Sequence, residues 1–131
     1  MIVIDPSAAV ELLLQTELGV RIGARVLDPA ERLFAPHLLD VEVTQVLRRL
    51  TQLREIDPAR SLQALDDYRA LLIERIAHND LLSRIWELRD SLTAYDAAYV
   101  ALAEALGSPL LTCDAKLARA HGHRATIELS S

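Results

Sequence analysis

The feature that most constrains the fold is the start of the chain, where a short apolar run ends on an acid. Ile2, Val3 and Ile4 favour a buried strand. Asp5 follows directly, and Pro6 then suits the first turn of a helix. Because functional sites in open α/β sheets collect beyond the carboxyl ends of the strands, we expect Asp5 to lie where such a site would form.

The rest of the chain alternates between helical and strand-like patterns. Helices are predicted over 6–15, 18–27, 38–54, 58–70, 79–90 and 94–106, the last of them ended by Gly107. Strands are predicted over 32–35, 71–77, 109–112 and 125–129, with a short helix starting at Asp114. This alternation predicts an α/β sandwich with a mostly parallel central sheet, formed by residues 1–131 as one domain.

The composition restricts the possible functions. With a net charge of −5, the chain cannot hold nucleic acid by overall charge, so such a partner would need localised positive charge or recruited cations. Aromatic residues make up only 4% of the chain, which argues against binding of single strands by stacking. A single cysteine, Cys113, excludes an internal disulfide and fits a reducing cytoplasm, and we expect neither a signal peptide nor a membrane span.

Three further acids are candidates to join Asp5. Asp114 follows an apolar run, as Asp5 does. If the two strands are parallel, both acids lie at the same edge of the sheet. Asp96 lies at the start of the most regular helix, and Glu42 lies in the first turns of another. Each has an ordinary structural explanation: Asp96 and Asp114 as helix N-terminal acids, Glu42 as a solvated residue with which Asp40 competes.

The acids are harder to explain together than singly. They come from four separate elements, and carboxylates that share a pocket repel one another when ionised. A divalent cation such as Mg²⁺ or Mn²⁺ would offset that repulsion, since such cations prefer oxygen ligands. This donor set is typical of metal-assisted hydrolysis of phosphodiester bonds.

The chain resembles the PIN-domain nucleases, and within them VapC, the toxin of a type II toxin–antitoxin pair. The most specific piece is the run Tyr95-Asp96-Ala97-Ala98-Tyr99. The segments that carry the resemblance, in the order of the family, are 2–8, 37–43, 92–103 and 109–118.

The resemblance implies a PIN-like three-layer α/β/α sandwich and a Mg²⁺- or Mn²⁺-dependent endoribonuclease acting on transfer RNA or ribosomal RNA. Asp5 and Asp96 would be the principal metal ligands, and Glu42 and Asp114 would complete the acidic pocket. The hydroxyls of Ser7 and Thr112 would hold ligands or waters, although both positions also suit ordinary strand-end and helix-start hydroxyls.

The chain departs from the family pattern at three places. Pro6 and Cys113 stand where alanine is common; Pro6 is harmless at a helix start, and Cys113 suits a small buried filler. A further acid found in some relatives beyond the last Asp is missing, because Lys116 and Leu117 stand there. That loss weakens the case for a tightly held second metal.

Partners follow from the same resemblance. Lys116, Arg119 and Arg124 lie in an acid-free stretch after Asp114, and with Arg89 they are candidates for RNA phosphate contacts, the alternative being ordinary solvated charge. A VapC-like chain implies a VapB-like antitoxin whose C-terminal segment binds a groove between the 6–15 and 38–54 helices and inserts a basic side chain near the acids. It also implies a homodimer, and a heterotetramer or larger complex with the antitoxin.

Other classes of function fit less well. A haloacid-dehalogenase-like phosphatase needs a second Asp where this chain has Ser7, and a receiver domain needs an acidic pair where there is only Asp5. A non-catalytic PIN-like binding module is disfavoured because all the acids are present. A PIN protein that processes ribosomal RNA is an alternative. The small size of the chain and its lack of extra domains favour the toxin.

Overall fold

A five-stranded parallel sheet forms the centre of the computed structural model, which describes residues 1–131. Its strands are β1 (Ile2–Ile4), β2 (Leu33–Pro36), β3 (Ile73–Ile76), β4 (Leu110–Thr112) and β5 (Ile127–Leu129). Their order across the sheet is β3-β2-β1-β4-β5, and every neighbouring pair is parallel. The order reverses beside β1, which is where open α/β sheets form a ligand crevice.

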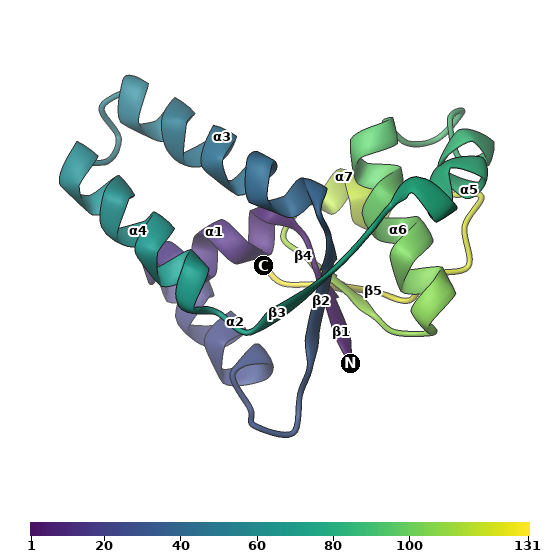
Figure 1. Ribbon diagram of the computed structural model, residues 1–131, viewed down its shortest axis with the longest axis horizontal. Coiled ribbons are helices and arrows are strands. Elements are labelled where there is room, and N and C mark those ends of the chain that lie inside the picture. Colours follow the sequence, from purple (N-terminus) through teal and green to yellow (C-terminus); the bar gives the residue numbers. More distant parts are fainter.

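Helices cover both faces of this sheet (Figure 1). Before β3 the chain forms α1 (Pro6–Leu14), α2 (Glu17–Val26), α3 (Leu38–Gln52) and α4 (Pro58–Ala70); after it come the 3-10 turn η1 (Asn79–Leu81), α5 (Leu82–Glu87), α6 (Ala94–Leu106) and α7 (Ala115–Ala118). Helices α1 to α4 gather on one side of the strands, and α5 and α6 lie on the other. The predicted three-layer α/β fold is confirmed, with a sheet that is parallel throughout.

The core explains why β1 and α6 sit at the centre. All three residues of β1 are fully buried, and so is the continuous stretch 97–103 of α6, which packs on β1 and β2. Small alanines in that stretch allow the helix to approach the sheet closely. Gly107 ends α6 in the left-handed conformation (φ 60°), as the sequence predicted.

One predicted helix is wrong in its extent. Residues 79–90 do not form a single helix; η1 leads into the short α5, which ends at Glu87. The buried Leu88 turns the chain inward, and the turn-forming residues Asp90 and Ser91 follow it. Trp86 consequently points outward rather than into the core. None of the helices combines the length and apolar character needed to cross a membrane.

Candidate active site

Asp5 lies at the carboxyl end of the central strand, next to the end of β4. The register pairs Ile4 with Leu111, so the residues that follow, Asp5 and Thr112, are neighbours. The Asp5 residue is only 4% exposed, and its Oδ2 accepts a hydrogen bond from the hydroxyl of Thr112. Strand pairing therefore positions the first acid and the group that holds it.

The other carboxylate oxygen of Asp5 is held by α1. Its Oδ1 accepts hydrogen bonds from the Ser7 hydroxyl (2.7 Å) and from the backbone N–H of Ala8 (3.0 Å). The Ser7 oxygen in turn accepts the backbone N–H of Cys113 (2.8 Å), which ties α1 to the segment after β4. Asp5 is thus also the N-cap of α1, and this structural role fixes the orientation of its carboxylate.

Asp114 is linked to Asp5 through a single hydroxyl. The Thr112 Oγ1 that donates to Asp5 accepts the backbone N–H of Asp114 at 3.0 Å. Asp114 caps α7 by accepting the backbone N–H of Lys116 at its Oδ1 (2.8 Å). The helix-capping explanation considered for Asp114 is therefore correct, and capping occupies one of its two oxygens.

Asp96 and Glu42 approach from two helices. Asp96 lies in the first turn of α6, whose N-terminus is capped by the hydroxyl of Thr93. Glu42, near the start of α3, accepts at Oε1 a 2.7 Å hydrogen bond from the hydroxyl of Tyr99, which is on α6. Tyr99 is not among the site residues predicted from the sequence. Its position three residues after Asp96, on the same side of the helix, is the signal that points to it.

Burial and neighbouring negative charges raise the pKa values of Asp5, Glu42 and Asp96. Burial raises the pKa of Asp5, and the charge of Asp114 adds to that rise, whereas hydrogen bonds from Ser7, Thr112 and Ala8 oppose it. Burial likewise raises the pKa of Asp96, with contributions from the charges of Asp114 and Asp5.

Glu42 belongs to the same electrostatic cluster. Burial raises its pKa, the hydrogen bond from Tyr99 works against that rise, and the charges of Asp96 and Asp5 add to it. The charges of acids at the ends of β1 and β4 and on α3 and α6 therefore act within one group.

Asp40, the competitor of Glu42, is engaged elsewhere. Its Oδ1 accepts hydrogen bonds from the Tyr68 hydroxyl (2.6 Å) and from Nε of Arg75 (2.9 Å). Although burial alone would raise the pKa of Asp40, these two bonds hold it below its usual value. Asp40 is a satisfied structural acid that pins α3 to α4 and β3, and this leaves Glu42 as the acid that faces the others.

The acids suit a hard cation in their chemistry. No three His, Cys, Asp or Glu side chains of the chain lie close enough together to hold a metal ion by themselves. Mg²⁺ does not require such a cluster, because proteins usually bind it through one or two carboxylates, with waters and substrate phosphates completing its shell. The oxygen-only donor set and the raised pKa values of Asp5, Glu42 and Asp96, caused first by burial and then by neighbouring negative charges, fit such a cation.

The four basic candidates for RNA contacts are not equally placed. Lys116 and Arg119 are exposed on or beside α7, close in sequence to Asp114. Arg89 lies between α5 and α6, where its guanidinium covers the ring of Trp86. Arg124 lies away from the acids. Its backbone N–H donates a hydrogen bond to the carboxylate of Glu104. Glu104 is eight residues after Asp96 on α6, which is about 12 Å along the helix axis.

Comparison with known proteins gives this geometry a family. The PIN-domain family model matches residues 2–122. Ribonuclease VapC12 of Mycobacterium tuberculosis is 42% identical over 129 residues, covering 98% of each protein. Ribonuclease VapC9 of the same species is 47% identical over 117 residues, covering 89% of this chain and 88% of that protein. The chain belongs to the VapC ribonucleases of the PIN-domain family. VapC ribonucleases are the toxins of VapBC toxin–antitoxin systems.

Solved structures agree with this VapC fold. The crystal structure of PAE2754 from Pyrobaculum aerophilum aligns with a TM-score of 0.67 at 25% identity, covering 96% of this chain and 81% of that one. VapBC2 from Rickettsia felis, solved with a DNA fragment from its promoter, aligns over 100% of both chains with a TM-score of 0.73 at 14% identity.

Proposed function

We propose that this VapC chain is a Mg²⁺- or Mn²⁺-dependent endoribonuclease that cuts transfer RNA or ribosomal RNA at a pocket formed by Asp5, Glu42, Asp96 and Asp114. The observation that carries the proposal is the grouping of acids at the carboxyl edge of a parallel sheet: the Thr112 hydroxyl joins Asp5 to Asp114, and the charges of Asp5 and Asp96 raise the pKa of Glu42. Buried acids that raise one another's pKa create a site that favours a cation. The whole of 1–131 would act as one PIN domain in the cytoplasm.

The proposed roles follow from what holds each side chain. A divalent cation held by these acids would supply positive charge to the scissile phosphate and would lower the pKa of a water. Asp5 is fixed on both oxygens by Ser7, Thr112 and Ala8, so it offers preoriented lone pairs. Asp96 is set by the first turn of α6 and would be the second principal ligand.

Glu42 and Asp114 would complete the pocket. Tyr99 bonds only Oε1 of Glu42, so Oε2 remains available to orient a water or to accept its proton. Asp114 uses Oδ1 for its helix cap and retains Oδ2. Ser7 and Thr112 would act by holding Asp5 and Asp114 in register rather than by touching substrate.

RNA cleavage by the purified protein tests this proposal. We expect cleavage with Mg²⁺ or Mn²⁺, none in excess EDTA, and a loss of at least about a hundredfold in Asp5→Asn and Asp96→Asn. Asp66→Asn is the matched control, because Asp66 is exposed and pairs only with Arg69 on α4. Undiminished cleavage in EDTA, or in Asp5→Asn, would overturn the proposed mechanism.

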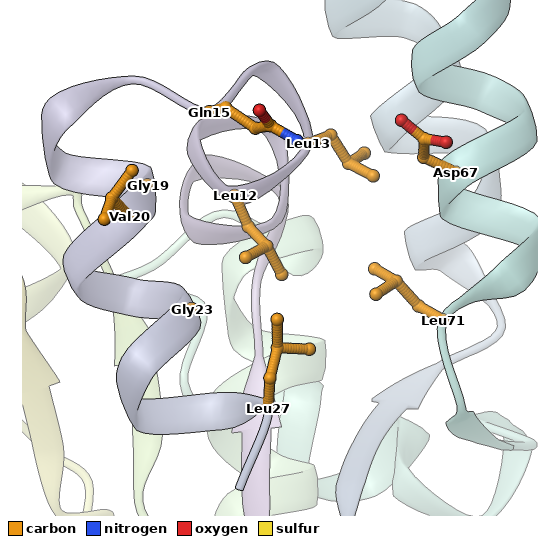
Figure 2. Close-up of a pocket in the computed structure, with 9 residues that line it drawn as sticks. All are labelled: Leu12, Leu13, Gln15, Gly19, Val20, Gly23, Leu27, Asp67 and Leu71. Carbon is orange, nitrogen blue, oxygen red and sulfur yellow. The ribbon is translucent and has the colours of Figure 1, made fainter.

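A VapB-like antitoxin is the expected partner, and we propose that it binds beside α1. A groove of about 420 Å³ lies between α1, α2 and the end of α4 (Figure 2). It is lined by Leu12, Leu13, Gln15, Gly19, Val20, Gly23, Leu27, Asp67 and Leu71. The far wall thus comes from α4 rather than from the 38–54 helix named in the sequence prediction.

The groove is close enough to the acids for one segment to reach both. Leu12 is seven residues from Asp5, about 10 Å along α1. An extended chain spans that distance in roughly three residues. An apolar antitoxin segment seated in the groove could therefore place a basic side chain among the carboxylates, as part of a complex built on a VapC homodimer.

A further inference from the structure

The exposed aromatic residues of the chain gather at one end of α6. The sequence contains one Trp, one Phe and three Tyr. Phe34, Tyr68 and Tyr99 are buried, whereas Trp86 is 67% exposed and Tyr95 is 63% exposed. Tyr95 directly precedes Asp96, and Trp86 belongs to the helix that packs against α6. The low aromatic content argued against a surface that stacks bases, but the few exposed aromatic side chains lie at the end of α6 that carries Asp96.

Trp86 forms an ordered pair with Arg89 at the surface. Arg89 lies over its ring, with the guanidinium carbon 4.6 Å from the ring centroid. A hydrogen bond of 3.0 Å from Nη1 of Arg89 to the backbone oxygen of Trp86 fixes that arrangement. A cavity of about 380 Å³ opens beside the pair and is lined by Leu82, Ile85, Trp86, Arg89 and Ala94. Its volume lies within the range of small-ligand pockets.

The chemistry of this surface fits an unpaired nucleobase. Bases of single-stranded RNA stack on aromatic rings and on the planes of arginine guanidinium groups, and both are present here side by side. Arg89 adds a positive charge for a neighbouring phosphate, and no ion pair engages it. The nearby Glu87 is already paired with Arg84 at 2.9 Å, so its charge is offset.

The cavity lies at the end of α6 that carries one of the acids. Ala94, on its wall, belongs to the same first turn of α6 as Asp96, although residues two apart point to different sides of a helix. An RNA strand that passes the N-terminal end of α6 could therefore contact both the acids and, further along the strand, Trp86.

We propose that Trp86 and Arg89 form a stacking subsite for an unpaired base in the strand that is cut, so that the enzyme selects single-stranded regions of RNA. This inference rests on the proposed ribonuclease function and adds a specificity-determining element to it. The alternative occupant of the surface is a second copy of the chain.

Two measurements on the full-length protein test the subsite. Trp86 is the sole tryptophan, so its fluorescence reports on this position alone. In the Asp96→Asn background, a single-stranded oligoribonucleotide should quench that emission in a saturable way. In the otherwise unaltered enzyme, Trp86→Leu should raise KM for the same RNA roughly tenfold, the scale of one stacked base. Trp86→Phe should restore most of the loss, and Arg89→Gln should weaken binding further than Arg89→Lys.

The possible results distinguish failure of the stacking subsite from failure of the proposed ribonuclease function. Leu72→Ala, which alters an exposed residue before β3, should leave KM unchanged. Unchanged emission with RNA, or an unchanged KM in Trp86→Leu, would overturn the subsite while leaving ribonuclease activity in place. A shift of Trp86→Leu from dimer to monomer in size-exclusion chromatography would overturn it in favour of an interface between copies. If the unaltered protein cleaves no RNA with either metal, the ribonuclease proposal itself fails, and the subsite with it.

Discussion

The hydroxyl of Tyr99 donates a 2.7 Å hydrogen bond to Oε1 of Glu42, joining the buried face of α6 to the start of α3. Glu42 is thereby oriented by the same helix that carries Asp96, three residues before Tyr99. The bond stabilises the charged carboxylate against the burial and the neighbouring charges that raise its pKa. Two of the four acids are therefore coupled through one helix as well as through their charges.

Replacing Tyr99 by Phe should uncouple them. The ring remains in place, so the free energy of unfolding should fall by only about 1–2 kcal/mol. Without the donor, the pKa of Glu42 should rise further, and the acidic limb of the kcat/KM profile should move to higher pH. Cleavage at neutral pH should fall roughly tenfold, as is typical when a group supporting a ligand is removed.

Tyr68→Phe is the matched control for Tyr99→Phe. It removes an equivalent tyrosine–carboxylate bond, to Asp40, outside the acidic pocket. Its stability should fall by a similar amount, while the acidic limb of its pH profile stays where it is. An identical pH shift in both variants would mean that Tyr99 acts only through general stability.

Much of this arrangement is legible in the sequence. Asp5 and Asp114 each follow a short apolar run, and parallel pairing of β1 with β4 then brings them to one edge without further information. The helix over 94–106 is set by its alanine-rich pattern and by Gly107, so its first-turn acid could be placed as well. The alternation of strand and helix patterns was sufficient to predict the α/β fold.

What the sequence could not provide depends on side-chain direction. Asp40 and Glu42 are two residues apart in the sequence. Only the hydrogen bonds from Tyr68 and Arg75 show that Asp40 has a structural role and that Glu42 is the candidate site residue. The outward turn of Trp86 follows from the early end of α5, which helical periodicity over 79–90 did not reveal. The link from Tyr99 to Glu42 likewise joins residues that are 57 positions apart.

Thr112→Val should separate the positioning of Asp5 from the fold. Valine matches the shape of threonine but removes the donor to Asp5 and the acceptor for the Asp114 N–H. We expect the free energy of unfolding, measured in urea, to fall by about 1–3 kcal/mol, and cleavage to fall roughly 10- to 100-fold. Thr112→Ser keeps the hydroxyl and should retain most of the activity. Equal losses in both variants would show that packing by the methyl group, not the hydroxyl, is what matters.

Neutralising an acid of the pocket should stabilise the metal-free protein. The pKa of Asp96 is raised in the folded state, so between its ordinary value of 3.8 and the raised value the folded protein binds more protons than the unfolded chain. Its contribution to stability therefore falls as the pH rises through that interval. Asp96→Asn removes this penalty and should raise the melting temperature by a few degrees (~2–4 °C) at neutral pH in EDTA.

Two comparisons check the sign of that effect. The gain from Asp96→Asn should shrink as the pH falls through the raised pKa of Asp96, because the unaltered carboxyl then takes up a proton itself. Mg²⁺ should raise the melting temperature of the unaltered protein more than that of Asp96→Asn, since the cation offsets the same repulsion. A lower melting temperature for Asp96→Asn in EDTA at neutral pH would contradict the electrostatic account of the pocket.

Val20 provides a test of the antitoxin groove that leaves the acids untouched. It lines the groove on α2 and is 64% exposed, so Val20→Arg should fold normally while placing a charge in an apolar contact surface. We expect at least tenfold weaker binding of the cognate VapB-like antitoxin by titration calorimetry, and unchanged RNA cleavage by the toxin alone. Leu62→Arg is the matched control: Leu62 is 61% exposed on α4 but lies outside the groove, so antitoxin affinity should be kept. Equal affinity in both variants would place the antitoxin elsewhere on the VapC surface.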